Sequence, residues 1–277
     1  MGMRITTNVA SINAQRTLTT SQREIGKSMA QLSSGSRITK AADDAAGLAI
    51  SENLKSQIRS YSQAARNAND GISMVQVAEG GLSEVSNILT RMRELGIQAS
   101  SDTLGDKERH YLDMETQQLK QEMQRISKTT RFGSQSLLDG TGKKFDFQVG
   151  INNNSFEDRI SFDSEELNAT TDELGVSGLD FSTKEGAQSA LEIVDGAQSK
   201  VAGYRATIGA IQNRFQSTVE NLGAQHENLS AANSRIRDAD IAASSAEMAR
   251  NSVLLNASVA TLAQANAQPQ LAMKLIG

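Results

Sequence analysis

The sequence predicts a mainly α-helical protein: a long antiparallel coiled-coil rod with a small β-hairpin region, and two terminal helices paired as a second coiled coil. Apolar residues recur at helical spacing over stretches of roughly fifty residues. Hydrophobic residues make up 38% of the chain and aromatic residues 4%, with no Trp. That composition is thin for a globular core and normal for long helices. The single proline, Pro269, leaves the long stretches uninterrupted.

The strongest periodicity lies between residues 187 and 236, where one apolar position returns every seventh residue. Its members are Val194, Val201, Ile208, Phe215, Leu222, Leu229 and Ile236. A second and softer series, which starts at Ala197, interleaves with the first. Together they form the heptad of a coiled coil, and a strict seven-residue period favours a left-handed supercoil. Such a helix buries its stripe only against another helix of similar length.

The best candidate partner runs from about Asp44 to Ala99. Its seam includes Leu54, Ile58, Tyr61 and Ile72, and the pattern slips by one residue after Glu79-Gly80-Gly81, which we interpret as a helix irregularity. The adjacent carboxylates of Asp43 and Asp44 suit the start of a helix. A turn at residues 100–105 leads to a third helix of about half that length, which ends near Thr129.

Residues 131–185 change character. Apolar residues alternate along 145–151 and again at Ile160 and Phe162, and Asn152-Asn153-Asn154-Ser155 supplies turn residues between them. Residues 141–185 carry four basic and ten acidic side chains, a net charge of −6. We expect a β-hairpin region that forms a solvated knob on the side of the rod.

The two ends of the chain resemble each other, because neither residues 1–45 nor 238–277 contain an aromatic residue. We therefore expect a discontinuous terminal domain, 1–45 plus 238–277, and a helical rod domain, 46–237. The apolar stripes of the first helix are out of phase, which predicts a bend or break before its end at Ser33-Ser34-Gly35-Ser36. The stripes predicted to face the core of an assembly are Ile5, Val9, Ile12, Leu18 and Ile25, with Met248, Leu255, Val259 and Leu262. Such weakly apolar segments are predicted to be disordered in the monomer and to order on assembly.

Several functional classes are disfavoured. The chain has no cysteine, and a net charge of −4 argues against a general nucleic-acid binder. His110 and His226 lack a second ligand at metal spacing, and no catalytic arrangement of side chains is evident. We expect no enzyme activity, metal or cofactor. The first residues lack the apolar core of a classical signal peptide, and no apolar run reaches the ~20 residues that span a bilayer.

Motifs at both ends of the chain resemble those of bacterial flagellin. The N-terminal hallmark is matched by LSSGSRITKAADDAAGLAI at residues 32–50, NANDGISM at 67–74 and TRMREL at 90–95. The C-terminal hallmark is matched by NLSAANSRIRDADI at 228–241 and LAQANAQPQ at 262–270. Two departures stand out: the family's usual Glu-Met pair is Ser244-Ser245 here, and only the hairpin region lies where large outer domains are common.

The resemblance implies a structural subunit that polymerises into the extracellular flagellar filament and serves swimming motility. Other flagellin subunits, an export chaperone, and the cap and hook-associated proteins are the implied partners. Export would use the flagellar type III apparatus. A hook–filament junction protein, or a minor or sheathed-core flagellin, is the alternative. A signalling coiled coil is disfavoured because the sequence lacks its membrane helix.

The resemblance also implies that vertebrate Toll-like receptors for flagellin contact this chain. The residues that match the receptor contacts are Arg91, Leu95 and Glu115. In a filament the same surface is expected to pack against neighbouring subunits.

Overall fold

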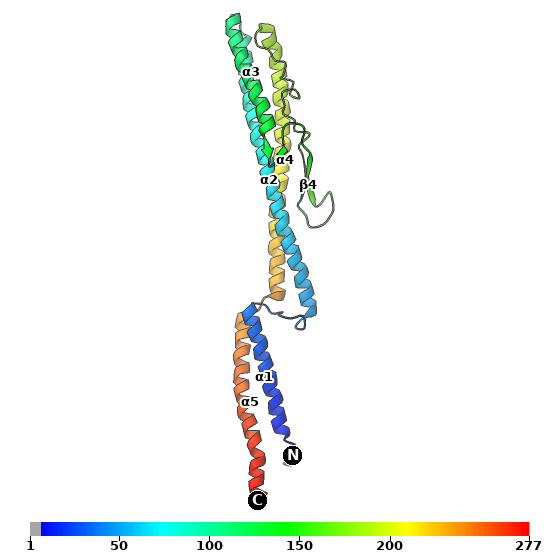
Figure 1. The fold of residues 1–277 in the computed structure, drawn as a ribbon, viewed down its shortest axis with the longest axis vertical. Helices are drawn as coiled ribbons and strands as arrows, with labels where there is room; N and C mark the ends of the chain where they lie inside the picture. Colours follow the sequence, from blue (N-terminus) through cyan, green and yellow to red (C-terminus); the bar gives the residue numbers. More distant parts are fainter. Residues whose placement is uncertain (1–6, 277) are drawn as a thin grey trace. The chain divides into compact units, whose positions relative to one another are not determined.

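The structure, a computed structural model, describes residues 7–276, with side chains for residues 7–268. Its long helices and short strands follow one another in simple order (Figure 1). They are α1 (Val9–Ser34), α2 (Ala45–Ala99), α3 (Asp106–Thr129), β1 (Arg131–Phe132), β2 (Gln135–Ser136), β3 (Lys144–Gln148), β4 (Arg159–Asp163), α4 (Lys184–Arg237) and α5 (Ile241–Ile276). Two compact units result: residues 1–57 with 228–277 form unit 1, and residues 58–227 form unit 2.

In unit 2, α2 and α4 pack against each other in antiparallel directions. Arg93 of α2 forms an ion pair with Asp195 of α4, with the guanidinium Nε 2.6 Å from the carboxylate. One turn earlier in α2 and one turn later in α4, Gln198 donates to Thr90 at 3.4 Å. Much farther along, Gly71 lies against the ring of Phe215. The pairing of the two long helices predicted from the sequence is therefore present.

The heptad of α4 supplies the centre of the core. Val194, Val201, Ile208 and Phe215 are buried, and Leu222 is buried near the end of unit 2. The other predicted seam residues are only half-buried: Leu54, Ile58, Tyr61, Ile72 and Leu229. Burial is most complete where a third layer covers α2 and α4.

That third layer consists of α3 and the segment 131–183. Leu137, Leu138, Phe162 and Phe181 are completely buried in the same core as the α2 and α4 seam residues. The prediction that residues 131–185 form only a solvated knob was therefore wrong. The sequence pattern did not reveal this burial, because the buried residues of the segment 131–183 are widely spaced and not periodic.

Polar side chains of α3 hold the return segment between β4 and α4. Gln124 accepts hydrogen bonds from the backbone and hydroxyl of Thr171, each at 3.0 Å. Asp113 accepts from the Phe181 amide at 3.0 Å, and Lys120 donates to the Leu179 carbonyl at 3.2 Å. These bonds satisfy backbone groups of a segment that has no regular structure.

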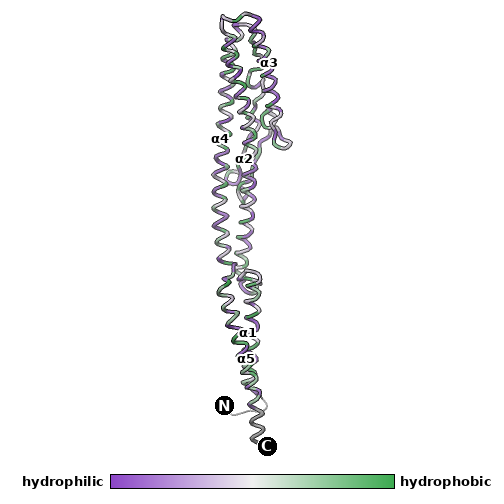
Figure 2. Tube along the Cα trace, turned by 90° about the vertical axis from the view of Figure 1, so that its left-hand side faces the viewer, coloured by the Kyte–Doolittle hydropathy of each residue, from purple (hydrophilic) through white to green (hydrophobic). Residues whose placement is uncertain are grey.

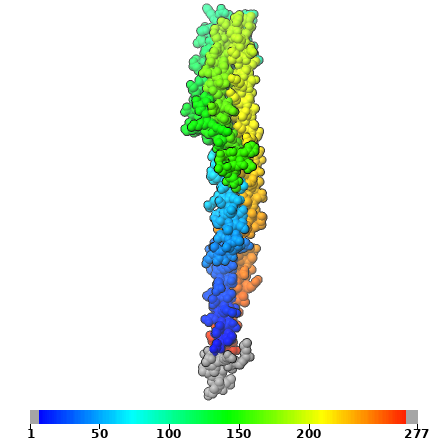
Figure 3. Space-filling view, turned by 90° about the vertical axis from the view of Figure 1, so that its right-hand side faces the viewer, coloured from blue at the N-terminus to red at the C-terminus, as the bar shows by residue number. Residues whose placement is uncertain are grey.

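The predicted β-hairpin pairs β3 with β4 in antiparallel register, with Phe147 opposite Ile160 and Phe145 opposite Phe162. The Phe147 ring meets Phe215 of α4 edge-on, with centroids 5.4 Å apart. A smaller hairpin, β1–β2, packs against α2 where Gly81 leaves room for Thr130 and Leu138. The helix runs through Gly80-Gly81 without a break, so the predicted irregularity is a packing site instead. Figure 3 shows residues coloured green standing out from the side of the helices of unit 2.

In unit 1, α1 and α5 run antiparallel to each other. The predicted break in the first helix is absent, because α1 continues from Val9 to Ser34. The Asn8 side chain caps its first turn, and Gly35 ends it in the left-handed conformation at φ 68°. Ile5 lies outside the described residues. Figure 2 shows hydrophobic and hydrophilic positions alternating along the helices rather than forming long apolar runs.

Candidate assembly surfaces

Small residues form the contact between α1 and α5. Within residues 9–34 and 241–268, the buried residues of these helices are Ser21, Ser28, Ser244, Ser258 and Ala265. Small side chains let the two backbones approach closely, and the departure from the family pattern at Ser244 supplies one of them. Two polar contacts fix the register near the start of α1: Asn8 donates to the Ala265 carbonyl at 2.8 Å, and Ser11 donates to the Asn266 side chain at 2.9 Å.

The large apolar side chains of α1 and α5 largely point away from this contact. The most exposed are Val9, Ile12, Met29, Ile241, Val253, Leu254 and Val259, of which Val253 is 68% exposed. Of the predicted assembly residues, Val9, Ile12 and Val259 belong to this set. The others are half-buried in the pair: Leu18, Ile25, Met248, Leu255 and Leu262. Val253 and Leu254 were missed because they lie off the seven-residue series of Met248, Leu255 and Leu262, although Val253-Leu254-Leu255 is a visible apolar run. Ile241 lies seven residues before Met248, and Met29 lies on the same stripe as Leu18 and Ile25, so the sequence pattern could have included both.

The two segments that lead into α1 and α5 from the long helices are tied together. Ser36 and Asp238 form an antiparallel bridge, the Arg37 amide donates to the Arg237 carbonyl at 2.6 Å, and the Ala239 amide donates to the Gly35 carbonyl at 2.9 Å. The Arg237 guanidinium also donates to Glu52 of α2 at 2.6 Å. The segment that follows α1 and the segment that precedes α5 are thus held together by backbone hydrogen bonds.

Asp43 organises the bend before α2. Its carboxylate accepts hydrogen bonds from the amides of Thr39 and Lys40, at 3.1 and 2.9 Å, and from the Thr39 hydroxyl at 2.9 Å. These bonds, that from Lys40 foremost, lower the pKa of Asp43 below its ordinary value. The carboxylate pair at residues 43 and 44 thus has a structural role: Asp44 accepts from the Gly47 amide at 2.8 Å.

The predicted receptor residues differ in their accessibility. Arg91 and Glu115 are exposed and paired at 2.9 Å, and Arg91 also reaches Glu94 at 3.0 Å. The hydrogen bonds to Glu115 and then to Glu94 raise the pKa of Arg91. Leu95 is only 1% exposed and belongs to the core of unit 2. In the folded monomer Leu95 therefore offers almost no surface to a receptor, whereas Arg91 and Glu115 are exposed.

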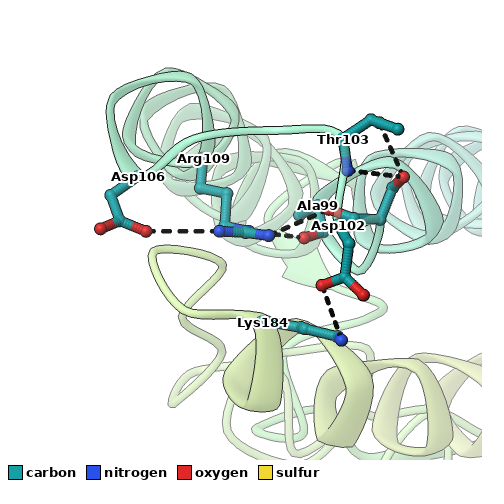
Figure 4. Close-up of polar contacts among 7 residues, drawn as sticks. Ala99, Asp102, Thr103, Asp106, Arg109 and Lys184 are labelled. Atoms are coloured by element: carbon teal, nitrogen blue, oxygen red, sulfur yellow. Dashed lines mark hydrogen bonds and ion pairs between the residues drawn. The ribbon is translucent and has the colours of Figure 1, made fainter.

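A buried arginine fixes the turn between α2 and α3 (Figure 4). Arg109 donates to the carbonyls of Ala99 and Ser101, each at 2.9 Å, and its guanidinium lies 3.3 Å from the Asp106 carboxylate. It thereby satisfies carbonyl groups left open at the end of α2. Lys184 at the start of α4 pairs with Asp102 of the same turn at 2.7 Å. No sequence pattern marks this cap beyond a basic residue one turn into α3.

The described part of the chain offers no site for metal chemistry or for a membrane span. No group of three or more His, Asp or Glu among these residues could hold a metal ion. No helix within the described range is long and apolar enough to cross a bilayer. His110 and His226 lie exposed on separate helices.

Comparison with known proteins identifies both halves of the chain. Residues 5–143 match the bacterial flagellin N-terminal helical region, and residues 191–276 match the bacterial flagellin C-terminal helical region. The flagellin of Halalkalibacterium halodurans is 43% identical over 274 residues, covering 99% of this chain and 100% of the relative. The flagellin of Bacillus subtilis is 39% identical, and a flagellar filament core protein of Brachyspira hyodysenteriae is 38% identical, each with 99% and 100% coverage.

Solved structures agree. The crystal structure of Bacillus cereus flagellin is 31% identical, with a TM-score of 0.50 over 61% of this chain and 94% of that one. A putative flagellar hook-associated protein of Vibrio parahaemolyticus shares the fold at 15% identity, with a TM-score of 0.59 over 71% of this chain and 100% of that one. The chain therefore belongs to the bacterial flagellin family and is a structural subunit of the flagellar filament outside the cell.

Proposed function

We propose that the chain joins the filament through the exposed apolar faces of α1 and α5, so that the terminal domain, residues 1–45 with 238–277, forms the core of the polymer. The observation that carries this proposal is the separation of small and large side chains. The fully buried side chains inside the pair are small, whereas seven large apolar side chains are exposed and the other predicted assembly residues are only half-buried. Exposed apolar side chains on this scale are a feature of surfaces that bind other proteins.

The free energy gained by apolar burial, compared with the cost of association, supports this proposal. Fully burying a Val, Leu or Ile side chain stabilises an assembly by about 1.5–3 kcal/mol. Association costs on the order of 4–15 kcal/mol. Covering several of the exposed residues of α1 and α5 is therefore enough to offset that cost.

Export through the flagellar type III apparatus suits a subunit whose terminal helices have little core of their own. The buried side chains of the α1 and α5 pair are serines and one alanine, so the pair is expected to be marginally stable in the monomer. An export chaperone would cover the apolar faces until assembly, and the cap and hook-associated proteins would meet the same faces at the two ends of the filament. A vertebrate Toll-like receptor would approach the exposed Arg91 and Glu115 pair.

The test is seeded growth of filaments, followed by negative-stain electron microscopy. Val253→Asp places a charge on the exposed apolar face of α5 and should abolish growth while leaving unit 2 folded. Glu247→Asp, at an exposed polar position of the same helix, is the matched control and should grow normally. Normal growth of the Val253→Asp chain would refute the proposed role of this face.

A further inference from the structure

A notch with a volume of about 680 Å³ lies in unit 2, where the loop between β3 and β4 meets α2 and α4. The apolar part of its lining consists of Val149, Ile160 and Leu222, each at most 5% exposed. Two aromatic side chains border it: Phe156 of the loop, which is 89% exposed, and Tyr61 of α2, which is half-buried. Pockets that hold small molecules have volumes of roughly 300–1,000 Å³, so the notch is large enough for one.

One face of α4 supplies the polar wall of the notch. Its members are Asn213, Arg214, Ser217, Thr218, Asn221 and Gln225. Within the described chain, the side chains of Asn213, Arg214 and Ser217 form no hydrogen bond or ion pair. The Gln225 amide group donates to the side-chain oxygen of Asn221, which leaves the Asn221 NH₂ group and the Gln225 oxygen open. The wall therefore offers several uncharged donors and acceptors to a ligand.

The loop that presents Phe156 is held in one shape. Asp158 is buried, and its carboxylate accepts hydrogen bonds from the amides of Asn152 and Asn154, at 3.3 and 2.9 Å. The Asn154 side chain in turn accepts from the Phe156 amide at 3.0 Å. A loop fixed in this way loses little conformational entropy when it binds. The Phe156 ring lies outside the core of unit 2, so packing of that core does not account for its position.

The charges in the lining of the notch cancel. Glu157 and Asp158 are matched by Arg159 and Arg214, which gives a net charge of zero. Two of the four are already engaged, because Asp158 binds the loop amides and Arg159 donates to the Asn153 side chain at 2.5 Å. An anionic ligand would thus find only one cation in the lining without a side-chain partner, and a cationic ligand would find only Glu157. The lining favours a neutral, polar ligand.

A sugar combines the two properties that this lining requires. Each sugar hydroxyl both donates and accepts, which matches the paired donors and acceptors of side-chain amides. The C–H face of a pyranose ring is apolar and packs flat on an aromatic ring. A purely apolar ligand would instead cover the amides of α4 and leave them unpaired, which is costly.

We propose that the notch binds a neutral oligosaccharide, which packs on the Phe156 ring and accepts hydrogen bonds from the amides of Asn213 and Asn221. This site belongs to unit 2 alone. It goes beyond the filament role of the chain and does not rest on the proposed role of α1 and α5.

The test is saturation-transfer NMR on the monomeric full-length protein with three neutral probes: maltotetraose, cellotetraose and chitotetraose in its fully N-acetylated form. Trigalacturonate is the acidic counter-probe. At least one neutral probe should bind and should shift the amide signals of residues 150–159 and 213–225. Binding of none of the three, shifts confined to other residues, or tighter binding of trigalacturonate than of every neutral probe would each overturn the proposal.

Variants of the lining give a second readout with the probe that binds. Phe156→Ser should weaken its binding about tenfold, because the stacking face is lost. Asn213→Ala should weaken it as well, because a hydrogen-bond donor is lost. Ser155→Ala, at an exposed position outside the lining, is the matched control and should bind as wild type does. All three positions are exposed, so circular dichroism should show an unchanged fold, and wild-type affinity in the Phe156→Ser chain would overturn the proposal.

Discussion

The close contact between α2 and α4 at Gly71 gives a sharp prediction for a single methyl group. A Cβ atom at position 71 would lie 2.6 Å from Cζ and 2.8 Å from Cε1 of Phe215. The Phe215 ring cannot easily retreat, because it is completely buried and packs edge-on against Phe147. Gly71→Ala therefore forces the ring out of its place, and overpacking of this kind costs about 1–3 kcal/mol.

The helix propensity of Ala opposes this overpacking cost, because Ala is favoured over Gly inside a helix by about 1 kcal/mol. Gly80 isolates that effect: it lies in the same helix, is exposed, and a Cβ there would meet nothing within 4 Å. Gly80→Ala should thus stabilise the monomer by about 1 kcal/mol. Gly71→Ala should be destabilising by about 0–2 kcal/mol, once the helix gain is subtracted from the overpacking cost.

The assay is urea unfolding of the monomer followed by far-UV circular dichroism, with the free energies of unfolding compared at equal slope. The quantity to compare is the difference between the two variants, expected to be about 1–3 kcal/mol. If Gly71→Ala stabilised the chain as much as Gly80→Ala, the ring of Phe215 would not lie against α2 at this point. The antiparallel register described above would then be incorrect.

Three further predictions concern polar groups. Arg109→Met should lower the free energy of unfolding by about 2–3 kcal/mol, because buried carbonyls at the end of α2 lose a charged donor; thermal unfolding that matches wild type would contradict the capping role. In the loop between β3 and β4, the buried Asp158 carboxylate accepts hydrogen bonds from the amides of Asn152 and Asn154, at 3.3 and 2.9 Å. Asp158→Ala should therefore speed hydrogen exchange of the amides in residues 150–157 and leave the helices unchanged, and unaltered exchange in the loop would show that the carboxylate does not organise it. For Asp43, the lowered pKa means that the cap contributes stability above the ordinary value near 3.8 and loses it as the pH falls through the lower, folded-state pKa. The carboxyl carbon shift of Asp43 in NMR should therefore titrate below 3.8, together with the Thr39 amide, and a midpoint at or above 3.8 would refute the cap.

Local sequence signals were enough for α2, α3 and α4 because each of these helices has a recognisable beginning, period and end. The Asp43-Asp44 pair, the seven-residue series from Val194 and the turn at 100–105 place α2, α4 and α3 within a few residues of their observed bounds. The alternation around Phe145 and Phe162 likewise predicted the hairpin that β3 and β4 form, but not its register. In each case the signal depends on residues close together in the chain.

Features that depend on distant residues could not be predicted in the same way. The burial of Phe181 and Leu138 requires α3 to lie over the other two long helices, and no periodic pattern marks either residue. The slip at Gly80-Gly81 suggested an irregular helix because the sequence does not reveal that a hairpin packs there. The outward position of Val253 is equally hidden, since it depends on which face of α5 meets the serines of α1.

Assembly through the terminal helices requires the exposed faces of α1 and α5 to become covered when the chain polymerises. Hydrogen exchange of the same protein, measured first as monomer and then as filament, reports this covering. We expect fast exchange across residues 9–34 and 241–268 in the monomer and strong protection of both ranges in the filament. Equal protection of these two ranges in monomer and filament would contradict it, and the contacts that hold the polymer together would then have to lie in unit 2.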